Sequence, residues 1–597
     1  MKDQLVYYER YAALQRWMIE RDLKAFIVVS SDPHGSEYLP DHWKGREWLT
    51  GFSGSAGTAV VTVFDQGFLW TDSRYFLQAA AELEGGPFKL MKQGQDESVG
   101  SYLGGYFREG DKIGIDGRCC SVDMWDEIEM EFAAEGVVLV DAGDPFEEIW
   151  SDRPPIPQGK VKIQPVKFAG LTAQDKIRMI RTHLKNDLGC YGLVVSQLDD
   201  IAWLLNLRGS DVEFNPVFVA YALLLQDSMW LYIDENKLTG AVRNHLKKND
   251  VVTRPYEAIY SDLATLGEQR IMVSRKCNCA LMQSVRVGRF HPSPITHIKA
   301  MKSPKEIAGF RRAMERDGVA LCKFMRWLKP AVRRGGVTEI DVDRKLHELR
   351  SEQDLYIGPS FGTIAAYGEH GAIVHYEATE ETNVELKPRG LLLLDTGAQY
   401  QDGTTDITRT IPLGPTTQEE KAVYTFVLKA HIALAQAVFP EGISGTNIDA
   451  IGRKELWRAG LDYGHGTGHG VGSYLCVHEG PHQIRKENMP APIYNSMTVT
   501  NEPGIYMEGK FGVRIENVEL TYLSPQLLGE GKRYLMFEPL TLCPIDREPI
   551  LTELLHGDEI EWIDRYHEFV RARLEELLDD EADRRWLRRA TRPLLDD

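Results

Sequence analysis

Two glutamates, Glu502 and Glu516, are spaced like facing residues on the two arms of a β-hairpin. Gly509 stands midway between them, and a three-residue hairpin loop favours glycine at its left-handed position. We therefore expect the two carboxylates to face one another. Arg514 lies two residues before Glu516, so its side chain is expected on the same face of the strand.

A second acidic pair, Asp395 and Asp406, follows an apolar strand pattern, but its register is ambiguous. Asp402-Gly403 is a two-residue hairpin signal, and a turn there would place Asp395 opposite Thr410. The two aspartates would then be offset by roughly 13 Å along the ladder. A shared metal centre needs them nearly opposite, so we predict a longer loop with Gly403 in a bulge. Solvent-exposed aspartates on an edge hairpin are the alternative for this pair taken alone.

Four convergent carboxylates favour the binding of divalent cations. They repel one another strongly unless cations neutralise them, and two divalent metals do that. The glycine-rich segment Gly464–Gly472 contains His465 and His469. Taken alone, such a segment is typical of a plain turn or a phosphate-binding loop. Between two acidic hairpins it supplies the imidazole that a carboxylate-rich dinuclear site lacks, and we take His469 as the fifth ligand.

Two further histidine-containing segments are considered as possible site residues. Residues His478–His482 match the HExxH pattern of zinc metalloproteases, which requires both histidines one turn apart on a helix. Gly480 and Pro481 oppose that helix by roughly 1 and 3 kcal/mol relative to alanine. We therefore expect no zinc-protease helix and keep His478 as a hydrogen-bond donor. His375 ends an apolar stretch, and taken alone it is typical of a buried core histidine.

The first half of the chain contains an internal repeat. Apolar runs at residues 24–30 and 191–196 each follow a helical pattern and precede a turn with aspartate. The segments LWTD, ending at Asp72, and LYID, ending at Asp234, correspond in the same order. Two related α/β domains are therefore predicted.

Two boundaries separate the predicted domains. The proline-rich stretch 152–165 favours extended chain, and Ser303–Glu306 predicts a capping box at the start of a helix. We predict domains at residues 1–160, 161–302 and 303–597.

The third predicted domain contains a repeat of its own. Pro330 and Pro440 are each followed by glycines and then by a Thr-x-Ile-Asp segment. Each copy predicts a long helix ended by proline and then a second helix. Duplicated halves that pack about a pseudo-twofold axis would assemble a site between them. The predicted fold class is α/β, with an α+β third domain.

The composition argues against a membrane-spanning, nucleic-acid-binding or exported protein. The chain has 597 residues, 43% hydrophobic and 26% charged, and no apolar run approaches the roughly 20 residues of a membrane span. With 88 acids and 69 bases the net charge is −19, which argues against nucleic-acid binding. We expect no export signal, and eight cysteines without zinc-finger spacing predict reduced thiols and a cytoplasmic protein.

These motifs resemble those of the creatinase, or pita-bread, metallopeptidases, and most closely the three-domain cytosolic Xaa-Pro aminopeptidases. The resemblance covers nearly the whole chain, and it implies two related creatinase N-terminal-like α/β domains followed by a pita-bread domain with pseudo-twofold symmetry. The segments that carry it are SDPHGSEYLPDHWKGREWLTGFSGSAGTAVVT, LWTDSRYF, LDDIAWLLNLRGSDVEFNPVF, LLLLDTGAQYQDGTTDITRT, HGTGHGVG, NEPGIY and VRIEN.

The resemblance also implies metal roles for all five ligand positions. Asp406 and Glu516 would bridge two divalent ions, Asp395 would complete one, and His469 and Glu502 would complete the other. Manganese is expected because oxygen-rich ligands favour hard ions, with cobalt or zinc as alternatives. A hydroxide shared by the two ions would attack the carbonyl before a proline nitrogen.

The catalytic side chains follow from the same resemblance. Glu502 would carry the proton, His375 and His478 would hold the substrate carbonyl and the developing oxyanion, and His465 would line the proline pocket. Arg514 would support the bridging Glu516 from outside the ligand set.

The predicted function is removal of the N-terminal residue from peptides with proline at position two. A prolidase restricted to Xaa-Pro dipeptides and a non-catalytic peptide-binding protein on the same fold are the alternatives. We expect peptide substrates, no nucleic-acid or membrane partner, and a homodimer. For Arg74 of the first domain, a substrate contact and a structural role are both considered.

Overall fold

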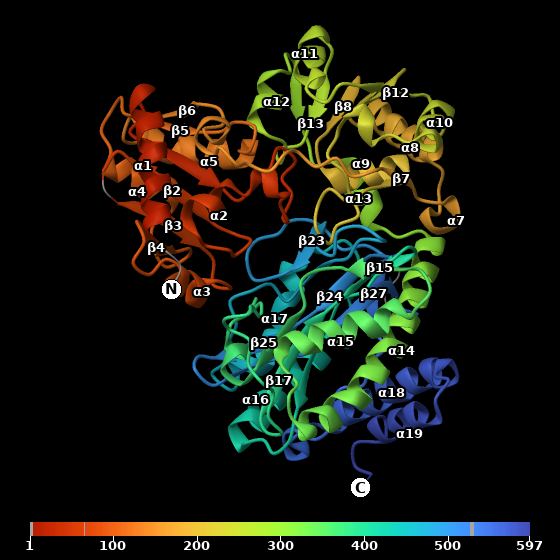
Figure 1. The fold of residues 1–597 in the computed structure, drawn as a ribbon. Coiled ribbons are helices and arrows are strands. Elements are labelled where there is room, and N and C mark those ends of the chain that lie inside the picture. The colour runs from red at the N-terminus through yellow and green to blue at the C-terminus, as the bar shows by residue number, and fades with distance from the viewer. Residues whose placement is uncertain (1–3, 65, 526–530, 597) are drawn as a thin grey trace. The chain divides into compact units, whose positions relative to one another are not determined.

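The computed structural model describes residues 4–64, 66–525 and 531–596. The chain divides into two compact units, one within residues 1–164 and 171–295 and the other within residues 165–170 and 296–597 (Figure 1). In the described ranges, no helix is long and apolar enough to cross a membrane.

The first unit contains two six-stranded sheets with the same topology. Their strand orders are β4-β3-β2-β1-β5-β6 and β12-β11-β10-β8-β13-β14, and in each the central strand pairs antiparallel with one neighbour and parallel with the other. The predicted repeat is confirmed, because the two apolar runs form the equivalent strands β1 and β8. The strands are β1 Ala25–Val29, β2 Thr58–Thr62, β3 Gly67–Thr71, β4 Phe88–Lys92, β5 Lys112–Ile115, β6 Val138–Asp141, β8 Gly192–Val195, β10 Tyr221–Leu225, β11 Met229–Tyr232, β12 Val251–Arg254, β13 Ile271–Val273 and β14 Gly288–Phe290.

The two repeats share a hydrophobic core. One cluster of buried side chains includes Ile27 and Ile113 from the first sheet together with Val194 and Leu223 from the second. On β1 the neighbouring residue Phe26 belongs to a different cluster, which is the alternation expected of a strand buried on both faces. The helices that flank these sheets include α1 Leu5–Glu20, α4 Val99–Tyr106, α5 Val122–Ala133, α8 Ala173–Asn186, α9 Leu198–Leu205 and α10 Gly240–Lys248.

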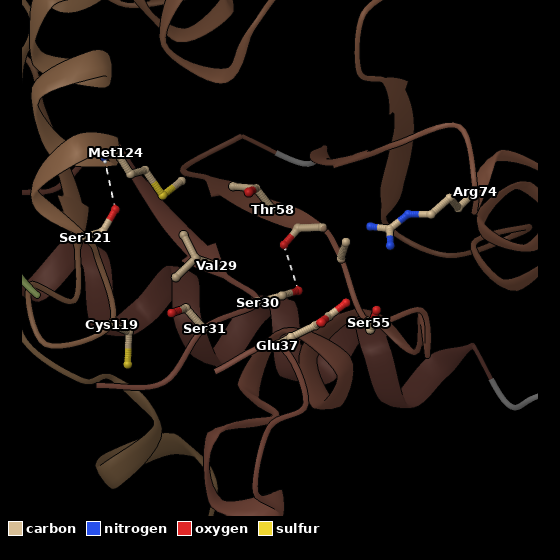
Figure 2. Close-up of a pocket in the computed structure, with 12 residues that line it drawn as sticks. Val29, Ser30, Ser31, Glu37, Ser55, Thr58, Arg74, Cys119, Ser121 and Met124 are labelled. Atoms are coloured by element: carbon tan, nitrogen blue, oxygen red, sulfur yellow. Dashed lines mark hydrogen bonds between the residues drawn. The ribbon is translucent and has the colours of Figure 1, made fainter. Parts of the chain in front are cut away.

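A cavity of ≈ 290 Å³ lies in the first repeat (Figure 2). Its lining includes Cys119, Ser121 and Arg74. Arg74 forms a two-pronged ion pair with Asp72, with its Nε at 2.8 Å from Oδ1 and its Nη2 at 2.7 Å from Oδ2. This pairing favours the structural interpretation of Arg74.

The second unit contains two helix pairs, and each pair is followed by a sheet. α14 (Pro304–Arg334) packs on α15 (Glu339–Ser351), and α16 (Gln418–Ala435) packs on α17 (Thr446–Trp457). The first pair precedes the sheet β16-β17-β20 and the second precedes the sheet β21-β28-β27-β24. This duplicated arrangement agrees with the predicted fold class.

The strands of the second unit that matter for the site are short. They are β16 Ile364–Tyr367, β17 Leu391–Thr396, β18 Ala398–Tyr400, β19 Gly403–Thr404, β20 Ile407–Pro412, β21 Phe439–Pro440, β22 Gly468–Gly470, β23 Glu479–Ile484, β24 Thr498–Asn501, β25 Gly504–Met507, β26 Phe511–Arg514, β27 Asn517–Leu523 and β28 Tyr534–Pro539.

Helix α14 begins as predicted but ends later. The Ser303 hydroxyl accepts from the Glu306 N–H, and the Glu306 carboxylate accepts from the Ser303 N–H, so the predicted capping box is confirmed. The prediction that Pro330 ends the helix is wrong, because the helix continues to Arg334. Pro330 itself is exposed, and burial of the helix residues on both sides of it favours a continued helix. The buried neighbours of this proline are Leu328, Ala331 and Val332.

The C-terminal helices brace the strands of the second unit. α18 (Gly557–Leu574) and α19 (Glu581–Ala590) pack against α14. Buried Arg409 of β20 donates to the hydroxyl of Tyr566 in α18 at 2.9 Å and to the carbonyl oxygen of Glu516 at 2.6 Å. Arg409 therefore links α18 to the backbone of Glu516, one of the predicted metal ligands.

Candidate metal centre

The hairpin between Glu502 and Glu516 has the predicted register. Its arms β25 and β26 pair antiparallel around Gly509, whose φ of 68° is left-handed. The pairing of β24 with β27 continues the same register beyond the two glutamates. Glu502 and Glu516 therefore lie opposite each other on neighbouring strands.

The hairpin between Asp395 and Asp406 has neither of the registers considered. β17 pairs with β20 so that Asp395 lies opposite Thr408, and β18 and β19 continue that register up to a two-residue turn at Gln401-Asp402. Asp406 lies two residues before Thr408, so the two aspartates are diagonal neighbours on one face of the ladder. The predicted longer loop and the bulge at Gly403 are wrong.

Packing against α14 explains this register. The buried carboxylate of Asp402 binds Arg312 Nε at 3.1 Å and also pairs with Arg316, so the helix holds the turn in place. A Cβ on Gly403 would lie 3.0 Å from the Cβ of Ala313. The glycine therefore permits a close approach of β19 to the helix, and no bulge is needed.

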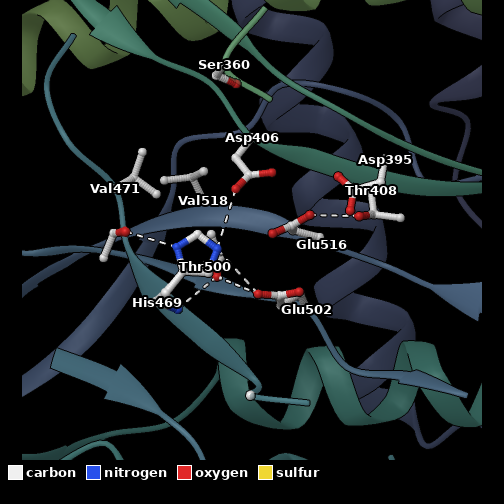
Figure 3. A network of polar contacts seen from close by, with 12 residues as sticks. Ser360, Asp395, Asp406, Thr408, His469, Val471, Thr500, Glu502, Glu516 and Val518 are labelled. Carbon is white, nitrogen blue, oxygen red and sulfur yellow. Dashed lines mark hydrogen bonds and ion pairs between the residues drawn. The ribbon is translucent and has the colours of Figure 1, made fainter. Parts of the chain in front are cut away.

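His469 lies on β22 and completes the acidic group (Figure 3). Its Nε2 lies 3.6 Å from Asp406 Oδ2 and 3.4 Å from Glu502 Oε1. Its Nδ1 lies 2.9 Å from the carbonyl oxygen of Gly470 and must donate to it, so the Nε2 lone pair faces the carboxylates. The ligand atoms of Asp406, His469 and Glu516 lie within 4.8 Å of one another.

Burial and mutual repulsion make it costly for all four carboxylates to be charged. Burial, followed by repulsion from Asp395 and Glu502, raises the pKa of Asp406 well above its usual range. Burial and the neighbouring Asp406 do the same to the pKa of Glu516. Burial also raises the pKa of Glu502 to about 7, although Arg514 opposes this. Bound cations would remove this cost.

The donor set fits a pair of divalent cations. The Oδ1 atom of Asp395 is buried and has no hydrogen-bond partner among the described residues, so its lone pairs face the group without a donor. Hard oxygen donors dominate, and four carboxylates balance the charge of two divalent ions. The structure brings together all five predicted ligands: Asp395, Asp406, His469, Glu502 and Glu516 (Figure 3).

Arg514 binds Asp395 directly and reaches Glu516 through a threonine. Its Nη2 lies 2.7 Å from Asp395 Oδ2, and both side chains are largely buried. The Thr408 hydroxyl accepts from Arg514 Nε at 3.2 Å and donates to Glu516 Oε2 at 2.7 Å. The predicted link between Arg514 and Glu516 therefore runs through Thr408.

His465 is connected to the acidic group by a tyrosine. Its Nδ1 donates to the carbonyl oxygen of Gly466 at 2.8 Å, so its Nε2 accepts from the Tyr506 hydroxyl at 2.7 Å. That hydroxyl in turn accepts from Arg514 Nη1 at 2.6 Å. A continuous chain of hydrogen bonds thus joins His465 to Asp395.

The other two predicted catalytic histidines lie beside this network. The ring of His478 packs edge-on against the ring of His469, with centroids 4.4 Å apart. His375 follows Val374, whose carbonyl oxygen accepts from Arg514 Nη1 at 3.5 Å. His478 is thus in contact with a predicted ligand, and the backbone next to His375 is in contact with Arg514.

The HExxH segment, residues 478–482, does not form a helix. Glu479 starts strand β23, and its buried carboxylate pairs with Lys299 Nζ at 3.2 Å and with Lys302. His482 Nε2 donates to a backbone carbonyl of β24 at 2.8 Å. The zinc-protease interpretation is therefore excluded, as predicted.

A buried ion pair holds the strands that carry the two aspartates. Arg350 of α15 binds Asp317 of α14, with Nε at 2.8 Å from Oδ1. Arg350 Nη1 also donates to the Thr396 hydroxyl at 2.6 Å, and the Thr405 hydroxyl donates to Asp317 Oδ2 at 3.0 Å. These two threonines adjoin the aspartates in sequence, so the helices fix both strands next to the ligands.

Two residues of the network, Thr408 and Tyr506, are absent from the sequence-based predictions. Strand periodicity points to both, because Thr408 follows Asp406 by two residues and Tyr506 follows Glu502 by four. Asp317 has no such signal, since only the packing of α14 brings it to the strands.

Comparison with known proteins agrees with this geometry. Residues 10–149 and 152–306 match the creatinase/prolidase N-terminal domain, residues 308–521 match metallopeptidase family M24, and residues 533–594 match the C-terminal region of that family. Aminopeptidase P1 of Lotus japonicus is 37% identical over 96% of this chain and 97% of the relative. A probable Xaa-Pro aminopeptidase P of Laccaria bicolor is 40% identical over 98% and 93%, respectively.

A solved structure of an X-prolyl aminopeptidase is also similar to this chain in three dimensions. The X-prolyl aminopeptidase of Caenorhabditis elegans, described as a cytosolic enzyme with a di-nuclear active site, superposes with a TM-score of 0.95. It is 35% identical, and the match covers 99% of this chain and 100% of that one. Since the likeness extends over nearly the full length in both sequence and structure, the chain belongs to the aminopeptidase P group of metallopeptidase family M24.

Proposed function

We propose that this protein is a dinuclear metalloaminopeptidase that removes the N-terminal residue from peptides with proline at position two. The observation that carries the proposal is the convergence of four carboxylates and His469 on one space. The relatives support it, because the Laccaria bicolor protein is named a probable Xaa-Pro aminopeptidase P and the nematode X-prolyl aminopeptidase has a di-nuclear active site.

The cofactor is a pair of divalent metal ions, for which we propose manganese. Asp395, Asp406, His469, Glu502 and Glu516 would hold the ions. When bound, the ions supply Lewis acidity that polarises a carbonyl and makes water acidic. Oxygen-rich ligands favour a hard ion such as manganese over softer alternatives.

The protein's own residues would position the substrate and move the proton. Glu502 takes a proton from the attacking water and delivers it to the proline nitrogen as the C–N bond breaks. His375 and His478 donate to the carbonyl oxygen and to the charge that develops on it. His465, oriented by Tyr506, lines the pocket for the proline ring.

Selectivity for proline has a physical basis. The Xaa-Pro bond has no N–H and carries a rigid ring, so a site that grips an ordinary scissile amide fits it poorly. A pocket shaped for the ring favours this bond over others.

A peptide series tests the proposal against the prolidase alternative. With metal-loaded protein, we expect release of the first residue from Xaa-Pro-Yaa tripeptides and no release from the matched Xaa-Ala-Yaa peptides. Cleavage confined to Xaa-Pro dipeptides would identify a prolidase instead.

Metal analysis tests the binding-only alternative. After removal of metal by chelation and reconstitution with manganese, cobalt or zinc, we expect two ions per chain and the highest activity with manganese. Fewer than one ion per chain would favour a peptide-binding protein.

We also propose that the protein is cytoplasmic and forms a homodimer. Its domains are proposed to span residues 1–160, 161–302 and 303–597. The description of the nematode enzyme as cytosolic supports the location. Sedimentation velocity tests the assembly, for which a single monomeric species would contradict the dimer.

A further inference from the structure

Four of the eight cysteines lie where the two N-terminal repeats contact each other. Cys119 and Cys120 directly precede the cap of α5, and Cys277 and Cys279 flank Asn278 at the start of α12 (Cys279–Gln283). The two helices occupy equivalent places, because each follows the fifth strand of its repeat. All eight cysteines are free thiols.

The backbone places Cys120 directly opposite Cys279. Ser121 and Asn278, which cap the two helices, form an antiparallel β-bridge. The N–H of Cys279 donates to the carbonyl oxygen of Cys120 at 2.9 Å. Directly opposed residues of an antiparallel ladder have Cα atoms about 4.5–5.5 Å apart. This separation lies inside the roughly 4.4–6.8 Å range of disulfide-linked cysteines.

The two sulfur atoms lie on the same side of the bridge, near one backbone oxygen. The Sγ atoms of Cys120 and Cys279 each lie 3.5 Å from the same carbonyl oxygen, that of Ser121. The two thiols therefore share one acceptor. Both residues are buried, with exposed fractions of 0% and 5%. Cys277 instead directs its thiol to the carbonyl oxygen of Asn278 at 3.5 Å.

From this geometry we propose that Cys120 and Cys279 are an oxidisable pair that hydrogen peroxide converts to a disulfide, which covalently joins the two N-terminal repeats. The proposal concerns the first unit and is independent of the metal centre.

The reaction would join two residues that the fold already holds opposite each other. Cys120, Cys277 and Cys279 already belong to the hydrophobic cluster that the two repeats share. Other cysteine pairs across the junction lack this direct opposition.

A route for a small oxidant lies next to the pair. The ≈ 290 Å³ cavity of the first repeat is lined by Cys119, Ser121 and Met124 (Figure 2). Ser121 is the residue whose carbonyl oxygen both sulfurs contact. The cavity thus admits a small uncharged molecule such as peroxide as far as Ser121, the residue next to Cys120.

The reaction balances with peroxide as the only co-reactant. One thiolate attacks peroxide, the O–O bond breaks, and a sulfenic acid and one water form. The second sulfur displaces the hydroxyl group as a second water, so that two thiols lose two electrons and two protons in total. Because the thiolate is the attacking form, and contact with Cys279 and burial raise the pKa of Cys120, oxidation should be slow at neutral pH and faster as the pH rises.

Peptide mapping of the full-length protein tests the proposal. Reduced protein is treated with hydrogen peroxide, alkylated, digested without reductant and analysed by mass spectrometry. We expect the peptides that contain Cys120 and Cys279 to appear joined and lighter by two hydrogen atoms, and dithiothreitol to separate them. The joined species should be lost in Cys120→Ala and Cys279→Ala and retained in Cys277→Ala.

Thermal unfolding provides a second readout. A disulfide that closes so long a loop stabilises the folded state, so the melting temperature of the oxidised wild-type protein should rise by roughly several degrees. Peroxide should cause no such rise in Cys279→Ala. A disulfide through Cys119 or Cys277, or alkylation of both Cys120 and Cys279 after peroxide treatment at pH 8.5, would overturn the proposal.

Discussion

The guanidinium group of Arg514 lies 2.7 Å from Asp395 and 2.6 Å from the Tyr506 hydroxyl, so one buried cation orients both a predicted metal ligand and the partner of His465. Arg514→Lys keeps the charge but loses the planar set of donors. We expect manganese affinity and kcat/KM to fall by roughly 10- to 100-fold. Calorimetric titration of metal-free protein and steady-state kinetics on an Xaa-Pro-Yaa peptide measure the two quantities.

A matched control is available on the surface. Arg485 forms a partly exposed pair with Glu487, at 2.7 Å. Arg485→Lys should leave both manganese affinity and kcat/KM unchanged. Unchanged metal affinity in Arg514→Lys would show that the arginine does not orient the ligand.

Thr408→Val removes the hydroxyl between Arg514 and Glu516 with little change in side-chain shape. A hydrogen bond to a charged group contributes about 1.5–3 kcal/mol, so manganese affinity should fall by roughly tenfold or more. Thr408→Ser retains the hydroxyl and should retain the affinity. Equal losses in the two variants, measured by calorimetry, would indicate lost packing instead of a lost hydrogen bond.

Asp406→Ala and Glu516→Ala should abolish turnover while leaving the fold intact. In the metal-free state each should also unfold at a higher temperature than the wild-type protein, because each removes a carboxyl group whose charged form burial disfavours. Asp406→Ala also removes the charge that, after burial, contributes most to raising the pKa of Glu516. Peptide hydrolysis, circular dichroism and scanning calorimetry follow these effects. Retained hydrolysis in either variant would count decisively against the site.

Glu519 gives the metal-free protein a pH-dependent stability. Its Oε2 atom is buried without a hydrogen-bond partner among the described residues, and burial raises its pKa from 4.5 to about 8. The folded chain therefore keeps a proton that the unfolded chain has released. Unfolding releases this proton, so the contribution of Glu519 to the free energy of unfolding falls as the pH rises from about 4.5 to about 8.

The variant Glu519→Gln isolates this contribution. Its stability relative to the wild-type protein should increase steadily across that pH window, as measured by urea unfolding with both proteins metal-free. Glu508→Gln, at the exposed tip of a hairpin, should show no such trend. A difference between Glu519→Gln and wild type that is constant with pH would mean that Glu519 is already charged in the folded chain.

The two hairpins show where sequence periodicity is sufficient and where it is not. The register of Glu502 and Glu516 follows from a local feature, the left-handed loop position of Gly509. The other hairpin turns at Gln401-Asp402, because arginines of α14 bind Asp402 and that helix approaches Gly403 closely. No pattern within the hairpin itself encodes this contact.

The same distinction applies to the partners of site residues. Alternation along a strand placed Arg514 on the ligand face, but it could not select Asp395 over Glu516 as its direct partner. The choice depends on where β17 lies beside β26, which is a property of the assembled sheets. Pro330 is a similar case, since the local rule for proline is overridden by packing on both sides of it.

The alignment of Glu502 with Glu516 is determined twice, once by the turn at Gly509 and once by the pairing of β24 with β27 behind them. The tip of this hairpin is consequently dispensable for bringing the two carboxylates together. A fluorophore, an affinity handle or a few extra residues could be grafted onto it, and the enzyme would keep the spacing on which its cofactor depends.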